Sequence, residues 1–366
     1  MKIYQITIFL LFLLGCCAYI STRLWQIVPF GQVGKIIFGS LVIFLFLAFI
    51  LSFALGNILP VGLTTVLYRV GSTWFFICIY LLMVFLIVDI IRLTHLVNID
   101  KFVFGNKYFF SALTILITIV MGFGYIKYQK KDRKELTINV AKTKQDKQLR
   151  IVAISDLHLG YGIGNKELNS WIKLINDEKP DIVLIAGDLI DTNIKPVLQR
   201  NMADNLKRIN AKHGVYAVLG NHEYISGGNE CIDFINSANI TLLQDSGILV
   251  NDLYVLGRDD VSNKSRKELA QLIESFDKTK AIILLDHQPI NLNDAAENNV
   301  DLQISGHTHR GQVWPISWIT DKIFEVSHGY CQKNDTHYYI TSGLGIWGGK
   351  FRIGSRSEYV VINLNY

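Results

Sequence analysis

Hydrophobic residues are concentrated in the first third of this 366-residue chain, in four separate stretches. The stretches cover residues 3–20, 36–55, 71–91 and 108–126. Each is close to the ~20 residues that an apolar helix needs to cross a ~30 Å hydrocarbon core. Their interiors lack the ionisable residues that transporters usually place at mid-membrane, and Asp89 stands only at the trailing end of the third stretch. The pattern predicts that residues 1–126 form a bundle of four transmembrane helices that serves as an anchor.

The first apolar stretch has an alternative interpretation as a cleaved signal peptide. Met1 and Lys2 precede it, and Leu14-Gly15-Cys16 loosely resembles a lipoprotein cleavage site. The single positive charge and the bulky Leu14 argue against cleavage, so four spans remain the favoured prediction.

Positive charge directly follows the fourth stretch and indicates the orientation of the chain. Residues 127–134 contain five Lys and Arg residues. Because basic residues at the end of a span favour the cytoplasmic side, we expect a multi-pass protein of the cell membrane with a cytoplasmic C-terminal domain. A basic linker is predicted over residues 127–148, and its charge also suits contact with anionic headgroups.

From residue 149 onward, short runs of β-branched and aliphatic residues alternate with helical periodicity. Ile151–Ser155 and Ile182–Ala186 have the composition of buried strands. Between them, the segment Leu168–Ile175 repeats apolar residues at i, i+3, i+4 and i+7, as an amphipathic helix does. This repetition of strand, helix and strand predicts a layered α/β domain over residues 149–366.

Five of the expected strands end in residues that commonly bind metal ions. The motifs are Asp156-Leu157-His158, Gly187-Asp188-Leu189-Ile190-Asp191, Gly220-Asn221-His222-Glu223, Asp286-His287 and Gly306-His307-Thr308-His309. Because α/β folds place their sites at the carboxyl ends of strands, we expect these side chains to meet. Five such motifs in order are far more specific than one Asp-x-His, which occurs often by chance.

The donor set consists of imidazoles, carboxylates and one amide oxygen. Mixed nitrogen and oxygen donors suit Mn, Fe, Zn or Co with five or six ligands. The donors are too many for one ion, so two divalent ions ~3.5–4 Å apart with a shared carboxylate are expected. The five cysteines show no CxxC spacing, and no disulfide framework is predicted.

Taken together, the five motifs resemble those of the calcineurin-like metallophosphoesterases, and the similarity covers residues 149–366. Asn-His-Glu-Tyr at 221–224 and the glycine-rich segment at 342–345 look most like the bacterial membrane-associated branch of that family. The resemblance implies an αββα sandwich of two facing mixed sheets flanked by helices. It also implies a hydrolase, because two divalent ions lower the pKa of a bridging water and supply hydroxide near neutral pH.

The resemblance assigns a role to each motif. Asp188 would bridge the two ions, and His222 would be the catalytic histidine that protonates the leaving group. Asp191 and Glu223 are interpreted as carboxylates that orient the imidazoles and the bridging aspartate, with a turn or cap role as an equal alternative. The first ion would be held by Asp156, His158 and His309, and the second by Asn221, His287 and His307.

Two further features near the motifs are candidates for substrate binding. Arg310 follows the last ligand and could clamp a phosphate with its planar guanidinium, or it could be an ordinary surface arginine. Arg352 and Arg356, beside the glycine-rich segment, are weaker candidates of the same kind. The apolar segment 313–319 contains Trp314 and Trp318. It could be a flap that receives acyl chains, with simple packing on the core as the alternative.

These features predict a membrane-anchored enzyme that hydrolyses a phosphoester or a pyrophosphate, with a lipid-linked phosphate as one candidate substrate. Its partners would be the lipid bilayer and the substrate, and no protein partner is evident from the sequence. The net charge of +5 comes without a dense basic stripe, so nucleic acid is not expected and a nuclease ranks lower. A catalytically silent membrane receptor or scaffold on the same fold is the other alternative, and the complete ligand set argues against it.

Overall fold

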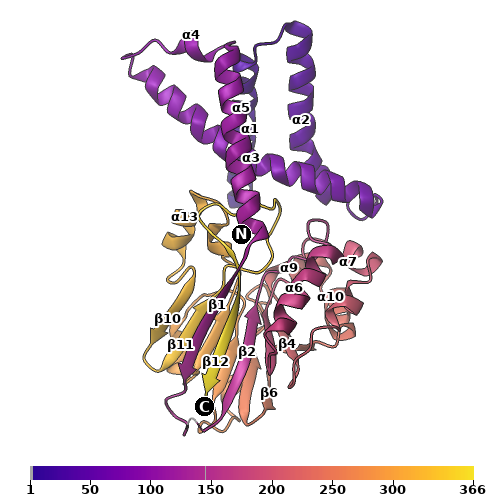
Figure 1. Ribbon diagram of the computed structural model, residues 1–366, viewed down its shortest axis with the longest axis vertical. Helices are drawn as coiled ribbons and strands as arrows, with labels where there is room; N and C mark the ends of the chain where they lie inside the picture. The colour runs from indigo at the N-terminus through magenta and orange to yellow at the C-terminus, as the bar shows by residue number, and fades with distance from the viewer. Residues whose placement is uncertain (1–2, 145) are drawn as a thin grey trace. The chain divides into compact units, whose positions relative to one another are not determined.

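The computed structural model describes residues 3–144 and 146–366 of the chain. Figure 1 shows its helices and strands in chain order. The chain divides into two compact units, Met1–Gly124 and Tyr125–Tyr366. The predicted boundary of the membrane region, at residue 126, falls within two residues of this division.

Five helices are described in the N-terminal part of the chain. They are α1 (Ile3–Ile27), α2 (Gln32–Ala54), α3 (Val61–Leu93), α4 (Asp100–Val103) and α5 (Lys107–Gln129). Three of them, α2, α3 and α5, are long and apolar enough to cross a membrane. The apolar stretch described in α1, Leu11–Ile27, is shorter, so the predicted count of four spans is not confirmed. Met1 and Lys2, which bear on the signal-peptide alternative, lie outside the described residues.

An ion pair joins α1 to α3 within the N-terminal unit. Arg23 Nη2 lies 2.5 Å from Asp89 Oδ2, and the Tyr19 hydroxyl donates to the same oxygen. A charge among apolar helices is costly unless it is paired, so this contact explains why α3 tolerates Asp89. Nothing in the hydrophobic pattern pointed to Arg23 as the partner of Asp89.

The predicted linker over residues 127–148 is wrong for most of its length. Helix α5 continues to Gln129, and after Lys130 the chain forms strand β1 (Lys131–Asn139). Strand β1 pairs in parallel with β12 (Ser357–Asn365), with Lys131 opposite Ser357. Charged side chains are tolerated on an edge strand because one face and one edge meet water, so the basic composition did not reveal the pairing.

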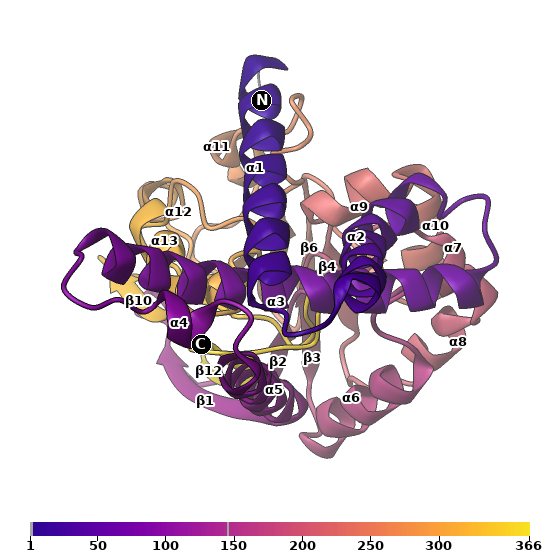
Figure 2. The ribbon, with the colours of Figure 1, turned by 90° about the horizontal axis from the view of Figure 1, so that it is seen from above.

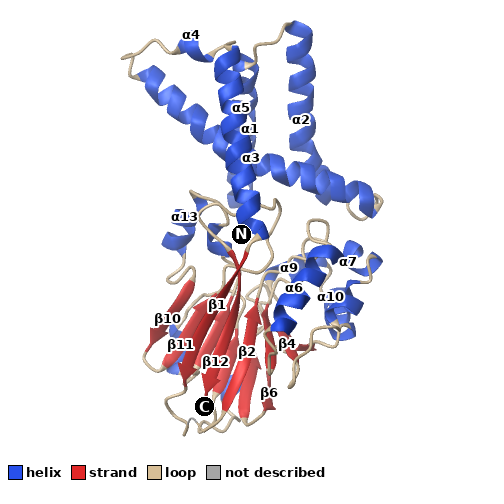
Figure 3. Cartoon of the chain, viewed as in Figure 1, coloured by secondary structure: helices blue, strands red, loops and turns tan. Residues whose placement is uncertain are grey.

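The C-terminal unit contains two six-stranded mixed sheets (Figure 3). The first has the order β1, β12, β2 (Gln148–Ile154), β3 (Ile182–Ala186), β4 (Val215–Val218) and β5 (Thr241–Leu242). The second has the order β10 (Gly329–Lys333), β11 (Thr336–Ile340), β9 (Leu302–Ser305), β8 (Ile282–Leu285), β7 (Leu253–Gly257) and β6 (Ser246–Val250). Strands β2 to β5 are parallel to one another, as are β7, β8, β9 and β11.

Alternate side chains of the strands point into different cores. Ile151 and Ile283 lie in the core between the two sheets, whereas Val152 faces the helices outside the first sheet. Those helices are α6 (Asn165–Asp177), α8 (Met202–Leu206) and α10 (Asn229–Ser237). Helices α11 (Leu269–Ile273) and α12 (Asn293–Glu297) cover the second sheet, on the opposite flank of the unit (Figure 2). The predicted two-sheet αββα sandwich is therefore confirmed.

The segments that carry the five motifs all leave the carboxyl ends of parallel strands, namely β2, β3, β4, β8 and β9. Several short helical segments follow these strands. Among them are α7 (Lys195–Gln199), α9 (Asn221–Ser226), the 3-10 turn η1 (His309–Gly311) and α13 (Ile316–Ile323). The two sheets face each other, so their carboxyl edges bring the motifs to one place.

Candidate metal centre

Most of the predicted ligands occupy left-handed backbone conformations directly after a strand. Residues other than glycine rarely adopt positive φ, because the Cβ atom then crowds the backbone. Such conformations cluster at functional sites, where the surrounding structure holds them in place. Positive φ values occur at Asp156 (53°), His158 (48°), Asp188 (52°), His307 (70°) and His309 (47°).

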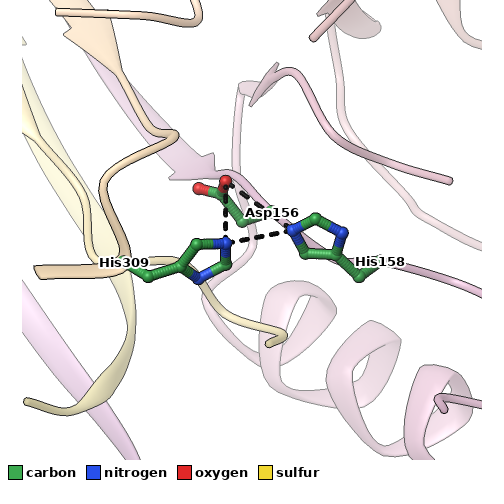
Figure 4. Close-up of side chains that lie close together, drawn as sticks. All are labelled: Asp156, His158 and His309. Carbon is green, nitrogen blue, oxygen red and sulfur yellow. Dashed lines mark hydrogen bonds and ion pairs between the residues drawn. The ribbon is translucent and has the colours of Figure 1, made fainter. Parts of the chain in front are cut away.

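Asp156, His158 and His309 form a first group of donors (Figure 4). His309 Nε2 lies 3.0 Å from His158 Nε2 and 3.5 Å from Asp156 Oδ1. His158 Nε2 lies 4.0 Å from the same Asp156 oxygen. Two nitrogens that bind one ion at ~2.1 Å in octahedral geometry lie about 3 Å apart, so these separations suit a shared cation.

Asp188, His287 and His307 form a second group, and Asn221 lies beside them. The Asn221 side-chain oxygen is 3.3 Å from His287 Nε2 and 2.8 Å from His307 Nδ1. His287 Nδ1 lies 2.7 Å from the Ala186 carbonyl oxygen. That contact places the ring proton on Nδ1 and leaves the Nε2 lone pair available for a metal.

The Asp188 carboxylate lies between the two groups. Its Oδ2 atom is 3.2 Å from His287 Nε2 and 3.7 Å from His158 Nε2, and its Oδ1 atom accepts from the His222 amide at 2.9 Å. Burial alone would raise the pKa of Asp188, but the surrounding imidazoles, His287 first, lower this pKa well below its usual range. The carboxylate is therefore ionised and within reach of both donor groups.

The electrostatics of two imidazoles, His307 and His309, also fit a metal-binding role. Burial would lower the pKa of His287, but Asp188 and Asp156 raise it well above its usual value. Burial, with His287 next, lowers the pKa of His307 to about 4. Burial, followed by His158 and Arg352, lowers the pKa of His309 well below its usual value. Both rings are thus neutral at pH 7, which is the form that binds a metal ion. The buried nitrogen and oxygen donors fit divalent cations.

Asp191 lies between two histidines at the side of the centre. Its Oδ1 atom is 3.6 Å from His158 Nδ1 and 3.4 Å from His222 Nδ1. Burial would raise the pKa of Asp191, but the two imidazoles outweigh burial and lower it to about 2. Burial would lower the pKa of His222, but Asp191 and Asp188 raise it to about 9. This geometry favours the orienting interpretation of Asp191 over a turn.

Glu223 contacts backbone rather than imidazole. Its buried carboxylate accepts from the amides of Gly220 at 2.7 Å, Ile190 at 2.8 Å and Asp188 at 3.1 Å. Burial and the nearby Asp188 raise the pKa of Glu223 to about 7. The three hydrogen bonds tie the segment after β3 to the start of α9, so the cap alternative describes Glu223 better than an orienting role.

Two glycines allow the chain to approach the ligands closely. A Cβ atom on Gly220 would lie 2.1 Å from Asp188 Oδ1. Gly187 has φ of 82°, and a Cβ atom there would lie 2.5 Å from His287 Nδ1. A side chain at either position would displace a predicted ligand.

Arg352 has a role that sequence reasoning missed. Its side chain is fully buried, and Nη1 donates to the His309 carbonyl at 2.8 Å. Its Nη2 atom donates to the carbonyls of Ser342 at 2.6 Å and Gly345 at 2.9 Å. The suggested phosphate contact is wrong for Arg352, because its donors bind the glycine-rich segment and a ligand backbone. An arginine among glycines gives no pattern that could have signalled this burial.

Arg310 remains a candidate for substrate binding. It directly follows His309, with φ of 47°, and its side chain is half-buried. Within residues 3–144 and 146–366, no side chain pairs with its guanidinium. The apolar segment 313–319 is divided between interior and surface. Val313 is buried, whereas Trp318, on α13, is 61% exposed.

Comparison with known proteins places the chain in a family. The calcineurin-like phosphoesterase family profile matches residues 149–311. An uncharacterised metallophosphoesterase of Campylobacter jejuni is 32% identical over 261 residues, which cover 70% of this chain and 69% of that protein. An uncharacterised metallophosphoesterase of Helicobacter pylori strain J99 is 32% identical over 60% of this chain and 61% of its own length. A Danio rerio protein described as a transmembrane protein with metallophosphoesterase domain is 28% identical, over 70% of this chain and 62% of that protein.

The chain belongs to the calcineurin-like phosphoesterase family. It is a metal-dependent phosphoesterase, and its three long apolar helices associate it with a membrane. The predicted family and enzyme class are thus confirmed.

Proposed function

We propose that the chain is a multi-pass membrane hydrolase that cleaves a phosphoester or a pyrophosphate with two divalent ions, drawn from Mn, Fe, Zn and Co. The observation that carries this proposal is the position of Asp188 Oδ2, 3.7 Å from His158 Nε2 and 3.2 Å from His287 Nε2. One ionised carboxylate shared by two donor groups suits a pair of ions better than one. When bound there, two divalent ions would activate a water and offset charge on the phosphoryl oxygens.

The donor groups divide into two sets in this proposal. Asp188 belongs to both sets and would hold the ions at a fixed separation. Loss of any other donor would weaken the binding of one ion, whereas loss of Asp188 would weaken the binding of both. The first set is Asp156, His158 and His309, and the second is Asn221, His287 and His307.

His222 is the proposed proton donor to the leaving group. Its side chain is 14% exposed and its Nδ1 atom lies 3.4 Å from Asp191 Oδ1. Asp191 orients the ring and stabilises its protonated form, so His222 carries a proton at neutral pH. The water loses a proton to solvent and its oxygen bonds to phosphorus. The bond from phosphorus to the leaving oxygen breaks, and that oxygen takes the His222 proton.

Arg310 is proposed to bind a substrate phosphate, and Glu223 to hold the segments that carry Asp188 and His222. A guanidinium with no ion-pair partner among the described residues, one position after a ligand, can form paired hydrogen bonds with phosphate oxygens. Glu223 acts through the backbone, so it is a positioning residue.

The proposed topology has four spans, with α1 as the first, and a cytoplasmic catalytic unit. The Arg23–Asp89 pair supports α1 as a lasting part of the N-terminal unit. The five basic residues between 127 and 134 support the cytoplasmic side.

Metal content and hydrolysis by the purified full-length protein in detergent test the proposal together. We expect two equivalents of metal per chain and release of phosphate or nitrophenol from a panel of aryl phosphates and nucleoside diphosphates, abolished by a chelator. His287→Ala should lose one ion and the activity. His328→Ala is the matched control, because His328 pairs with Glu358 at 3.2 Å outside the donor groups. A single equivalent of metal with full activity would contradict the two-ion proposal, and two ions without hydrolysis would favour a scaffold.

A further inference from the structure

Exposed apolar side chains gather at the edge of the catalytic unit that carries the metal ligands. Nine large apolar side chains are exposed in the part of residues 131–366 that the structure describes. Six of them follow the carboxyl ends of ligand-bearing strands, and the other three, Ile248, Leu249 and Tyr330, lie on the edge strands β6 and β10. We call the six the apolar rim: Leu198, Ile225, Ile290, Trp318, Ile319 and Ile323.

The rim is densest on α13, close to the donor groups. Trp318, Ile319 and Ile323 are 61%, 53% and 69% exposed. At the end of this helix, the Phe324 ring lies 6.0 Å from the ring of His307. The Thr308 hydroxyl donates to the Ser327 carbonyl at 2.6 Å, which joins the segment after α13 to the segment between two ligands. An apolar surface held this close to a hydrolytic centre is available to an apolar part of a substrate or a partner.

A second part of the rim lies beside His222. Ile225 is 63% exposed and stands three residues after His222 on α9, so the two side chains lie on one face of the helix. Leu198, on α7, is also exposed. The Ile194 amide bonds to the Ser226 carbonyl at 3.3 Å and so joins the two segments. Figure 1 shows α7, α9 and α13 beyond the same ends of the strands.

The chain also enters the catalytic unit at this edge. Strand β1 is parallel to β12, and β12 is antiparallel to β2. Strand β1 is therefore antiparallel to β2. The first residue of β1, Lys131, lies at the edge of the sheet where β2 ends and Asp156 follows. Helix α5, one of the three helices able to cross a membrane, ends at Gln129, so Lys130 alone separates it from the sheet.

The last turn of α5 is fixed to the catalytic unit rather than free. Tyr128 is fully buried in the core outside the first sheet, and its hydroxyl donates to Glu167 at 2.8 Å. Lys131 Nζ donates to the Tyr128 carbonyl at 2.6 Å. A segment with these contacts lacks the freedom of a flexible linker.

We infer that the apolar rim docks on the bilayer and that the metal centre takes its phosphate group from a membrane lipid. This inference rests on the proposed phosphohydrolase activity. The chain enters the catalytic unit at the ligand edge directly after α5, and Trp318 is a residue type enriched at membrane interfaces. The lipid phosphate enters among the donor groups, and its acyl chains lie along α13. Hydrolysis then breaks a bond from phosphorus to oxygen at the headgroup and leaves the apolar product in the bilayer.

A comparison of two triple variants tests the lipid substrate. Full-length protein is assayed on phosphatidic acid and a polyprenyl diphosphate in mixed micelles, and on a soluble aryl phosphate. The rim variant Trp318→Ser/Ile319→Ser/Ile323→Ser should lower the ratio of lipid to soluble turnover by about tenfold, because three apolar contacts are lost. The control Ile248→Ser/Leu249→Ser/Tyr330→Ser removes the exposed apolar residues of the edge strands and should keep the ratio. An unchanged ratio in the rim variant overturns the inference, while absent hydrolysis of the soluble ester would instead reject the proposed function.

A second measurement tests docking without activity. In a background with the five native cysteines replaced, I319C and I248C are spin-labelled in the full-length protein and placed in lipid nanodiscs. Molecular oxygen concentrates in the bilayer, so it should speed the spin relaxation of the label at 319 more than a water-soluble nickel complex does. The spin relaxation of the label at 248 should respond more strongly to the nickel complex. Equal access of the nickel complex to both labels overturns the docking. So does an immobilised 319 label that neither reagent reaches, because a second copy or another protein would then cover the rim.

Discussion

Replacement of Arg352 by methionine should destabilise the catalytic unit and loosen the first ligand group. The guanidinium is fully buried, and its hydrogen bonds shorter than 3 Å go to three carbonyl oxygens, those of His309, Ser342 and Gly345. Methionine fills similar space without a donor, so three buried acceptors lose their partner. Each unsatisfied buried acceptor costs about 1–3 kcal/mol, which gives a gross loss of roughly 3–9 kcal/mol.

Part of this loss in the free energy of unfolding is offset, because methionine removes a guanidinium that is itself costly to bury. Burial lowers the pKa of Arg352 to about 10, which shows that the charged form is poorly solvated there. The net destabilisation should therefore lie near the lower end, about 3 kcal/mol. For a domain of this size, such a loss lowers the melting temperature by roughly 6–12 °C.

Thermal unfolding of the full-length protein in detergent measures the effect, and Arg356→Met is the matched control. Arg356 is 57% exposed and pairs with Asp132 at 2.6 Å, so the same substitution should cost about 1 kcal/mol or less. Arg352→Met should also weaken the binding of one of the two proposed metal ions by about 10- to 100-fold, because Arg352 supports the backbone of His309. Equal melting temperatures for the two variants, or unchanged metal retention against a chelator in Arg352→Met, would refute this role.

Three further predictions concern the centre and the topology. Asp188→Ala should remove both metal ions, since one carboxylate serves both donor groups, and full metal occupancy in the purified variant would contradict the shared position. His222→Ala should keep its ions but slow turnover by roughly 10²–10⁴-fold. The defect should shrink for a substrate with a very acidic leaving group, which needs little protonation. An equal defect for good and poor leaving groups would count against proton donation by His222. A cysteine at the exposed position Lys144 should react with an impermeant reagent only after cell lysis, and efficient labelling of intact cells would place the catalytic unit outside.

Several features of the fold were predictable because they depend on short-range pattern. The apolar runs that became α2, α3 and α5 are visible without any partner. The strand ends that carry Asp156, Asp188 and His307 follow runs of buried aliphatic residues. Parallel strands in a layered α/β domain share a carboxyl edge, so order along the chain was enough to expect that the donors meet.

Other features depend on contacts between distant segments, which no local pattern records. The charged run at the start of β1 looks like a solvated stem until β12, more than 200 residues later, supplies the backbone partners. Glu223 looks like a carboxylate beside a histidine, and only the folded chain shows that it accepts from three backbone amides.

Residue types and their order along the chain specify the chemistry of the centre, whereas long-range packing sets how that centre is held and what surrounds it. Residue type fixes which atoms can bind a cation, and the strand pattern fixes where along the chain they stand. The burial of Arg352 against three carbonyls depends on how far apart segments lie in space. The gathering of exposed apolar residues at the ligand edge depends on which side of the sandwich each turn occupies. Both are set by packing of the whole domain, because a buried donor or an exposed apolar side chain is defined only by its neighbours in three dimensions.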